Sequence, residues 1–178
     1  MERIPIEFHG GILPTRGSEY AAAFDVYVPE DFEIKQKRFA VPLGFCIQLP
    51  IGWKANMRPR SGFSVKGMEA EVRTTYKRYN GEEYVSKETI RIDADVLLGL
   101  VDSDYRDEVG VIVKVYELDA VAPQKHEFDT VVENHVYFTK NTRIAQMEIC
   151  GGMCELMVVD EISREIDRGG GYGHTGAK

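Results

Sequence analysis

Apolar residues recur at every second position over much of this chain, and this period restricts the fold more than any other feature. In residues 39–49 every odd position is apolar, and residues 109–115 carry valine at every odd position. Shorter versions occur at residues 23–28 and 136–138. Alternation of this kind is typical of strands with one buried face. Because long amphipathic helices are scarce, the sequence predicts an all-β domain, a distorted barrel or jelly roll of mainly antiparallel strands.

The size and charge of the chain limit what such a domain can bind. A chain of 178 residues with 43% hydrophobic content can bury one core, so we expect one domain over residues 1–166. The formal net charge of −7 argues against general nucleic-acid binding, which needs a basic surface. Any phosphate site is therefore expected to be local. Apolar runs are too short to span a membrane and the N-terminus lacks a signal-peptide core, so we expect a cytoplasmic protein.

The three cysteines, Cys46, Cys150 and Cys154, are expected to be free thiols. Their number is odd, and a chain of this length folds without disulfide staples. Cys150 and Cys154 are close in sequence, but there is no second cysteine pair and no histidine at ligand spacing. The sequence therefore favours buried or half-buried thiols over a metal site.

A single short helix is predicted at residues 61–66. Ser61 can cap its first turn, and Gly67 can end it in a left-handed conformation. The free backbone N–H groups of the first turn would face an anion.

A protruding hairpin is predicted from about Val72 to Ile92. Asn80-Gly81 is a strong two-residue turn signal between β-favouring segments rich in tyrosine. Lys77 and Arg78 near its tip either contact a partner or form a charged edge that prevents sheet pairing. A second stretch, residues 117–134, also interrupts the compact pattern.

Five short polar segments interrupt the strand pattern and resemble, in order, the five motifs of the homotrimeric dUTPases. The segments are Ala22-Ala23-Phe24-Asp25-Val26, Pro59-Arg60-Ser61-Gly62, Gly99 through Glu108, Thr142-Arg143-Ile144-Ala145-Gln146, and Arg168 through Gly176. The resemblance implies hydrolysis of dUTP to dUMP and pyrophosphate with Mg²⁺, at three sites between the subunits of a homotrimer. The stretches at about 72–92 and 117–134 are then insertions, which suggest a viral or otherwise atypical member. They either brace the trimer or bind a regulatory protein.

Asp102 is the candidate catalytic residue. Attack of water on the α-phosphorus needs a carboxylate that orients the water and takes its proton. Asp102 lies where the chain breaks between two apolar strands, a place that a simple turn aspartate would also occupy. The resemblance assigns it the catalytic role and places the ring of Tyr105 on the deoxyribose. Asp104 is a candidate structural acid.

Binding of the triphosphate needs several donors and charge compensation. Arg60, Ser61 and Gly62 at the predicted helix start, together with the Gln146 amide, are the candidates for phosphate. Mg²⁺ commonly keeps phosphate and water ligands, and the resemblance implies that Asp25 reaches it through a water. Arg143 either joins this site or holds it together through a buried ion pair.

The base is expected to be read by backbone groups. Many family members carry an asparagine where this chain has Val96, so uracil recognition would rest on the backbone of residues 97–101, Leu100 and Val101 included. Other departures from the family pattern are Ala23, Asp107, Asn141-Thr142 and Tyr172.

The C-terminal tail, residues 167–178, contains too much glycine to join the core and is expected to be mobile until ordered. It is either a frayed terminus or a lid. The resemblance implies a lid over the nucleotide, reaching another subunit, with these substrate-binding residues: Arg168, Tyr172, Gly173, His174 and Thr175. Two further functions stay open, a dCTP deaminase of the same fold and a nucleotide-binding regulator that acts through the insertions.

Overall fold

The structure is a computed structural model that describes residues 2–117, 129–151 and 154–167. Within these residues the chain forms fifteen strands and one six-residue helix, which confirms the all-β prediction. The elements are β1 (Glu2–Phe8), β2 (Thr15–Arg16), β3 (Phe24–Tyr27), β4 (Phe32–Glu33), β5 (Arg38–Pro42), β6 (Phe45–Ile47), β7 (Lys54–Arg58), α1 (Ser61–Lys66), β8 (Met68–Lys77), β9 (Glu83–Ile92), β10 (Ala94–Val96), β11 (Gly99–Asp102), β12 (Gly110–Val115), β13 (Thr130–Phe138), β14 (Arg143–Cys150) and β15 (Cys154–Val159).

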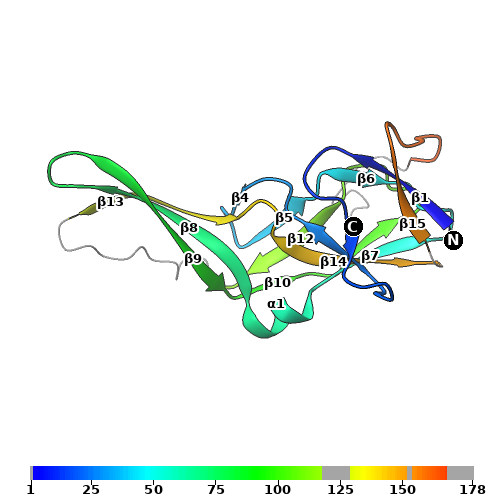
Figure 1. Cartoon of the computed structure of the whole chain (residues 1–178), viewed down its shortest axis with the longest axis horizontal. Helices are drawn as coiled ribbons and strands as arrows, with labels where there is room; N and C mark the ends of the chain where they lie inside the picture. Colours follow the sequence, from blue (N-terminus) through cyan, green and yellow to red (C-terminus); the bar gives the residue numbers. More distant parts are fainter. Residues whose placement is uncertain (1, 118–128, 152–153, 168–178) are drawn as a thin grey trace, which may run out of the picture.

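The strands form four sheets, seen together in Figure 1. Their orders are β15-β1-β6, β10-β12-β5, β11-β7-β14-β3-β2 and β4-β13-β8-β9. All pairs are antiparallel except β1 with β15. The five-stranded sheet matters most for function, because it carries the first four of the five polar segments or the residues next to them.

The predicted alternation appears directly in the core. Every odd residue from Phe39 to Leu49 is at most 8% exposed, and so is every odd residue from Val109 to Val115. The first run is two strands, β5 and β6, with the break at Pro42 and Gly44. Gly44 has φ +74°, and a Cβ there would lie 2.6 Å from the Gly10 carbonyl oxygen. Only glycine fits this bend.

The helix spans residues 61–66 as predicted, but its cap differs. Arg60, with extended backbone, is the N-cap, and no side chain caps the helix. Ser61 is the first helical residue, so the prediction that Ser61 caps the turn is wrong. Gly67 ends the helix with φ +75°, and its N–H donates to the Phe63 carbonyl.

The predicted hairpin is present and longer than expected, because β8 and β9 pair along their whole length from Met68–Ile92 to Lys77–Glu83. The tip is not a two-residue turn. Arg78 N–H donates to the Glu82 carbonyl and Gly81 N–H to the Arg78 carbonyl, which leaves three loop residues with Gly81 at φ +89°. A three-residue loop with a left-handed glycine at its end is the next commonest hairpin connection.

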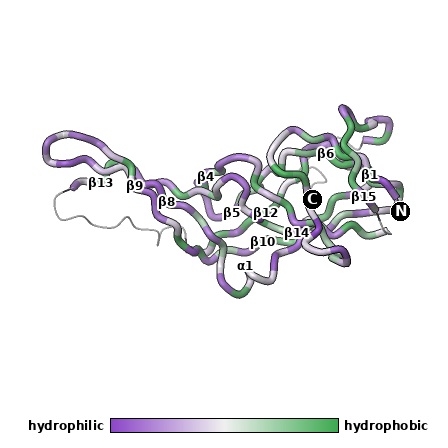
Figure 2. Tube along the Cα trace, in the orientation of Figure 1, coloured by the Kyte–Doolittle hydropathy of each residue, from purple (hydrophilic) through white to green (hydrophobic). Residues whose placement is uncertain are grey.

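The two insertions pair with each other. Strand β13 begins inside the second insertion and runs antiparallel to β8, from Thr130 opposite Lys77 to Tyr137 opposite Glu71, with a register shift between Val131 and Glu133. Strands β8, β9 and β13 thus form one arm that projects from the body (Figure 1). Figure 2 shows mainly hydrophilic residues toward the tip of its hairpin.

Contacts around Arg73 hold the base of this arm to the rest of the domain. We call this set, Arg73 with Asp31, Glu71 and Tyr137, the Arg73 clamp. The Arg73 guanidinium, on β8, donates to Asp31 in the loop before β4, pairs with Glu71 at 2.5 Å and lies 4.2 Å from the centre of the Tyr137 ring. The Asp31 carboxylate also accepts the Lys140 backbone N–H at 2.8 Å. A backbone hydrogen bond and the arginine lower the pKa of Asp31. The clamp therefore joins three segments through one guanidinium.

Candidate active site

Three neighbouring strands of the five-stranded sheet bring the first, second and fourth polar segments together. Gln146 on β14 lies directly opposite Asp25 on β3 and opposite Arg58 on β7. Arg60 follows β7 by two residues, and Arg143 begins β14. Residues up to 121 positions apart in sequence are therefore joined by strand register.

Asp25 is the centre of this group, which we call the Asp25 cluster: Asp25, Arg60, Arg143 and Gln146. Asp25 is 4% exposed. Its Oδ2 accepts from Arg143 Nη1 at 3.2 Å, and its Oδ1 accepts from Gln146 Nε2 at 3.3 Å. Arg60 Nε lies 3.4 Å from Oδ1. Arg143 forms the ion pair that was one of the two roles predicted for it, but only the Asp25 side of the pair is buried, because the Arg143 side chain is 52% exposed.

Arg60 has a buried N–H group that lies near the Asp25 carboxylate but makes no hydrogen bond within the described part of the chain. Its Nη1 donates to the Arg143 carbonyl at 3.2 Å, and its guanidinium carbon lies 5.1 Å from the centre of the Phe63 ring. The Nε is buried and has no hydrogen-bond partner among the described residues. The cluster therefore has one carboxylate that faces two guanidinium groups, and one of these has an N–H that makes no hydrogen bond to any described residue, an arrangement that suits an anion.

The donor set determines how a metal could bind here. In the described part of the chain, no group of three His, Cys, Asp or Glu side chains could hold a metal ion. The Asp25 carboxylate already faces three nitrogen donors. A metal ion at this cluster would therefore need most of its ligands from phosphate oxygens and waters, as Mg²⁺ commonly has.

Asp102 lies elsewhere in the same chain. It ends β11 and pairs with Lys54, at the opposite end of β7 from Arg58, which is opposite Gln146. Four residues along β7 and two strand spacings separate Asp102 from Gln146, a distance on the order of 15 Å. Within one chain, therefore, Asp102 does not join the Asp25 cluster.

The loop after Asp102 is tightly held. Tyr105 is 8% exposed, its N–H donates to the Asp102 carbonyl at 3.2 Å and its hydroxyl donates to the Glu108 carbonyl at 2.9 Å. Gly44 N–H donates to Glu108 Oε1 at 2.7 Å. The candidate structural acid Asp104 is half-buried.

Strand β11 is the edge of its sheet, so half of its backbone N–H and C=O groups point away from β7. Leu100 is 54% exposed, whereas Val101 is buried. The Leu97 N–H is already bonded to the Ile112 carbonyl, which removes it from the predicted base-reading set. Val96 is buried opposite Val113 and belongs to the core.

Other predicted residues have these places. Ser61 and Gly62 are exposed on the first turn of α1. The predicted tail residues Arg168, Tyr172, Gly173, His174 and Thr175 lie outside the described residues, as does the side chain of Cys154. Cys46 is buried and free, and burial raises the pKa of its thiol; Cys150 is free and half-buried.

The turn before Arg143 shows how the fourth segment keeps its geometry without glycine. Asn141 takes φ +69°, a left-handed conformation that asparagine adopts more readily than most residues. Its N–H donates to the Val28 carbonyl, and the Val28 N–H donates to the Thr142 carbonyl. No turn was predicted here, although asparagine is one of the residue types that favour turns.

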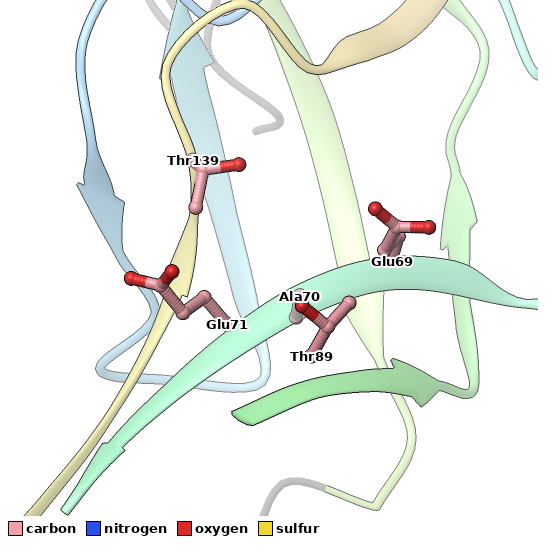
Figure 3. A pocket seen from close by; sticks show the side chains of 5 residues that line it. All are labelled: Glu69, Ala70, Glu71, Thr89 and Thr139. Atoms are coloured by element: carbon pink, nitrogen blue, oxygen red, sulfur yellow. The ribbon is translucent and has the colours of Figure 1, made fainter. Parts of the chain in front are cut away.

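A small cavity of about 80 Å³ lies near the base of the arm. It is lined by Glu69, Ala70, Glu71, Thr89 and Thr139 (Figure 3). Ligand pockets usually exceed about 300 Å³, and two carboxylates would repel a phosphate. Both are also engaged, Glu71 with Arg73 at 2.5 Å and Glu69 with Arg91 at 3.8 Å. This cavity is not a nucleotide site.

No helix in the described part of the chain has the length and apolar content needed to cross a membrane.

Comparison with known proteins identifies the family. The dUTPase family profile matches residues 10–89. A deoxyuridine 5'-triphosphate nucleotidohydrolase of Paramecium bursaria Chlorella virus 1 is 30% identical over 165 residues, which cover 92% of this chain and 89% of the viral protein. The fold is similar to a dUTPase mutant of Staphylococcus bacteriophage 80alpha solved with dUpNHpp (TM-score 0.56, 18% identity, 98% of each chain). It is also similar to a phage phi11 dUTPase of S. aureus solved with a structural Mg(II) ion (TM-score 0.57, 14% identity, 89% and 97% covered). The chain therefore belongs to the dUTPase family.

Proposed function

We propose that this protein hydrolyses dUTP to dUMP and pyrophosphate. The observation that carries the proposal is the Asp25 cluster, where one buried carboxylate faces two guanidinium groups and an amide, and where Arg60 Nε, 3.4 Å from Asp25 Oδ1, makes no hydrogen bond among the described residues. This surplus of positive charge, in a chain with net charge −7, suits a polyphosphate. Arg60 and Gln146 then contact phosphate oxygens.

We further propose that Asp102 orients the attacking water and takes its proton. The water oxygen bonds to the α-phosphorus while the bond from that phosphorus to the bridging oxygen breaks, and pyrophosphate leaves. Bound Mg²⁺ would neutralise phosphate charge, and Asp25 would hold one of its waters. Tyr105, which is 8% exposed and whose hydroxyl is bonded to the Glu108 carbonyl, would contact the sugar through its ring.

Because Asp102 and the Asp25 cluster are far apart within one chain, we propose that one subunit supplies Asp102 and another the cluster. A ring of three identical subunits would then hold three sites at its interfaces. Residues 1–166 would form the body of each subunit, and residues 167–178 would close over the nucleotide. The outer backbone edge of β11, at Gly99–Val101, would read the base, where a uracil offers matching donors and acceptors.

One assay tests the proposal. The protein is incubated separately with dUTP, dCTP and UTP in the presence of Mg²⁺, and both pyrophosphate and ammonia are followed. We expect pyrophosphate from dUTP alone. Ammonia from dCTP would instead indicate a deaminase, and tight nucleotide binding without turnover would indicate a regulator that acts through the arm. EDTA should abolish the pyrophosphate signal.

A further inference from the structure

Arg106 is a buried cation whose contacts the proposed reaction has not used. It is 4% exposed. Its Nη1 donates to the Ser103 carbonyl at 2.8 Å and to the Tyr105 carbonyl at 2.9 Å, and its Nε donates to the Ser163 carbonyl at 2.7 Å. No carboxylate of the described residues pairs with it. One guanidinium thus joins two places 57 residues apart in sequence.

The segment at Ser163 is docked by several other bonds. Ile162 is 2% exposed and its N–H donates to Glu7 Oε2 at 3.1 Å. Ser163 N–H donates to Gln48 Oε1 at 3.0 Å. Arg164 Nη1 returns a bond to the Arg106 carbonyl at 3.1 Å. Residues 162–164 are therefore held against the loop that follows Asp102.

A buried guanidinium without a carboxylate partner is costly, so its carbonyl bonds must be geometrically good. Arginine can make them because its five N–H donors lie in one plane and point in fixed directions, whereas a lysine ammonium is a compact charge on a flexible stem. The bond from Arg106 to the Tyr105 carbonyl connects it to the catalytic candidate, because the Tyr105 N–H donates to the Asp102 carbonyl. Asp102, Tyr105, Arg106 and Ser163 form one continuous set of contacts.

We propose that Arg106 is a positioning residue that fixes the Asp102 loop against residues 162–164. The proposal rests on the proposed function, since it assigns Asp102 to the reaction. Arg106 itself would not touch the substrate. It acts by holding the loop carbonyls, and a shift of about 1 Å in a catalytic group can cost about 10²-fold in rate.

The test compares Arg106→Gln with Arg73→Gln, because Arg73 is also an arginine with several contacts but lies at the base of the arm. For Arg106→Gln we expect kcat for dUTP to fall about 10²-fold with little change in KM. Arg73→Gln should keep both constants. Circular dichroism and the Tm of each variant ensure that rates are compared on folded protein. An unchanged kcat in Arg106→Gln, or an equal loss in both variants, would overturn the proposal.

Two further measurements separate positioning from a general loss of stability. Added guanidinium ion, at concentrations well below denaturing ones, should restore part of kcat in Arg106→Ala, whereas ammonium should not. Hydrogen exchange should quicken together in residues 103–109 and 160–167 of Arg106→Gln, and in neither segment of Arg73→Gln. Loosening of only one segment, or equal rescue by ammonium, would contradict the proposal. Failure of the proposed function looks different, since the parent chain itself would then leave dUTP intact.

Discussion

The Asp25 cluster and the Arg73 clamp are both built from carboxylates and guanidinium groups, but in opposite proportions. In the Asp25 cluster one carboxylate faces two guanidinium groups. In the clamp one guanidinium faces two carboxylates, and Lys87 approaches Glu71 at 3.8 Å. The cluster is centred on a carboxylate with 6% side-chain exposure, whereas the Asp31 side chain is 39% exposed. Both join segments far apart in sequence.

The difference separates a binding arrangement from a structural one. The clamp satisfies its own charges, because Arg73 Nη2 faces Asp31, Arg73 Nε faces Glu71 and the guanidinium lies over the Tyr137 ring. The Asp25 cluster keeps positive charge in surplus, and its Arg60 Nε–H, 3.4 Å from Asp25 Oδ1, makes no hydrogen bond among the described residues. An incoming anion can complete the cluster, but it would only compete with bonds already made in the clamp.

The largest expected effect comes from variants that leave either Asp102 or the Asp25 cluster intact in a subunit, but not both. Asp102→Asn and Arg60→Gln should each be nearly inactive when tested alone. Mixed and reassembled in equal amounts, they should recover about a quarter of parental activity, because about a quarter of intersubunit sites would combine an intact Asp102 with an intact Arg60. The measurement is pyrophosphate release from dUTP after refolding or co-expression.

The control for this mixing is a pair of variants in the same cluster, Arg60→Gln with Gln146→Ala. If both residues come from one subunit, this mixture gives no complementation beyond the sum of its members. Complementation by this pair but not by the first would contradict the proposed division of the site between subunits.

The second effect concerns the surplus charge itself. Arg60→Gln should lower kcat/KM for dUTP about 10²-fold, since a charge-assisted hydrogen bond contributes about 1.5–3 kcal/mol. Arg73→Gln, which removes the same charge from the clamp, should leave kcat/KM unchanged. The measurement is the steady-state kinetics of both variants. Similar losses of kcat/KM in the two would contradict the contrast between the cluster and the clamp.

The sequence predicted the core of the body well because strand alternation and burial have the same period. Residues 39–49 and 109–115 bury their odd positions as expected. It could also predict the members of the Asp25 cluster, from segment chemistry and the family resemblance. It could not predict their distances, because these depend on the register of β14 with β3 and β7.

The arm shows what local pattern cannot predict. The hairpin followed from turn residues close in sequence, but its tip was assigned one loop residue too few. The pairing of β13 with β8 is non-local, and nothing in residues 117–134 marks which strand they join. The clamp depends on that pairing, since it places Tyr137 opposite Glu71 and beside Arg73.

A smaller effect is expected on stability at the base of the arm. Arg73→Gln removes an ion pair to each of two carboxylates and a cation–π contact. Partly exposed contacts of these kinds together contribute about 1–2 kcal/mol. Urea denaturation should show this decrease in the free energy of unfolding, with hydrogen exchange faster in β8 and β13. Unchanged stability would show that strand pairing alone holds the arm.

The smallest effect is a pH dependence of stability that arises from Asp31 in the clamp. The Lys140 backbone N–H, followed by Arg73, lowers the pKa of Asp31 below the ordinary aspartate value of about 4. A carboxyl whose pKa is lower in the folded state stabilises the fold above its unfolded pKa. This contribution is lost as the pH falls through the folded pKa. Because Asp31 is partly exposed and screened by solvent, the contribution should stay below about 1 kcal/mol.

The Tm of the parent should therefore fall more steeply than that of Asp31→Asn as the pH is lowered from about 5 to 3. The exposed residue Glu19, changed to Gln, serves as the matched control. Equal slopes for the parent and Asp31→Asn would mean that Arg73 holds the arm through Glu71 and Tyr137 alone.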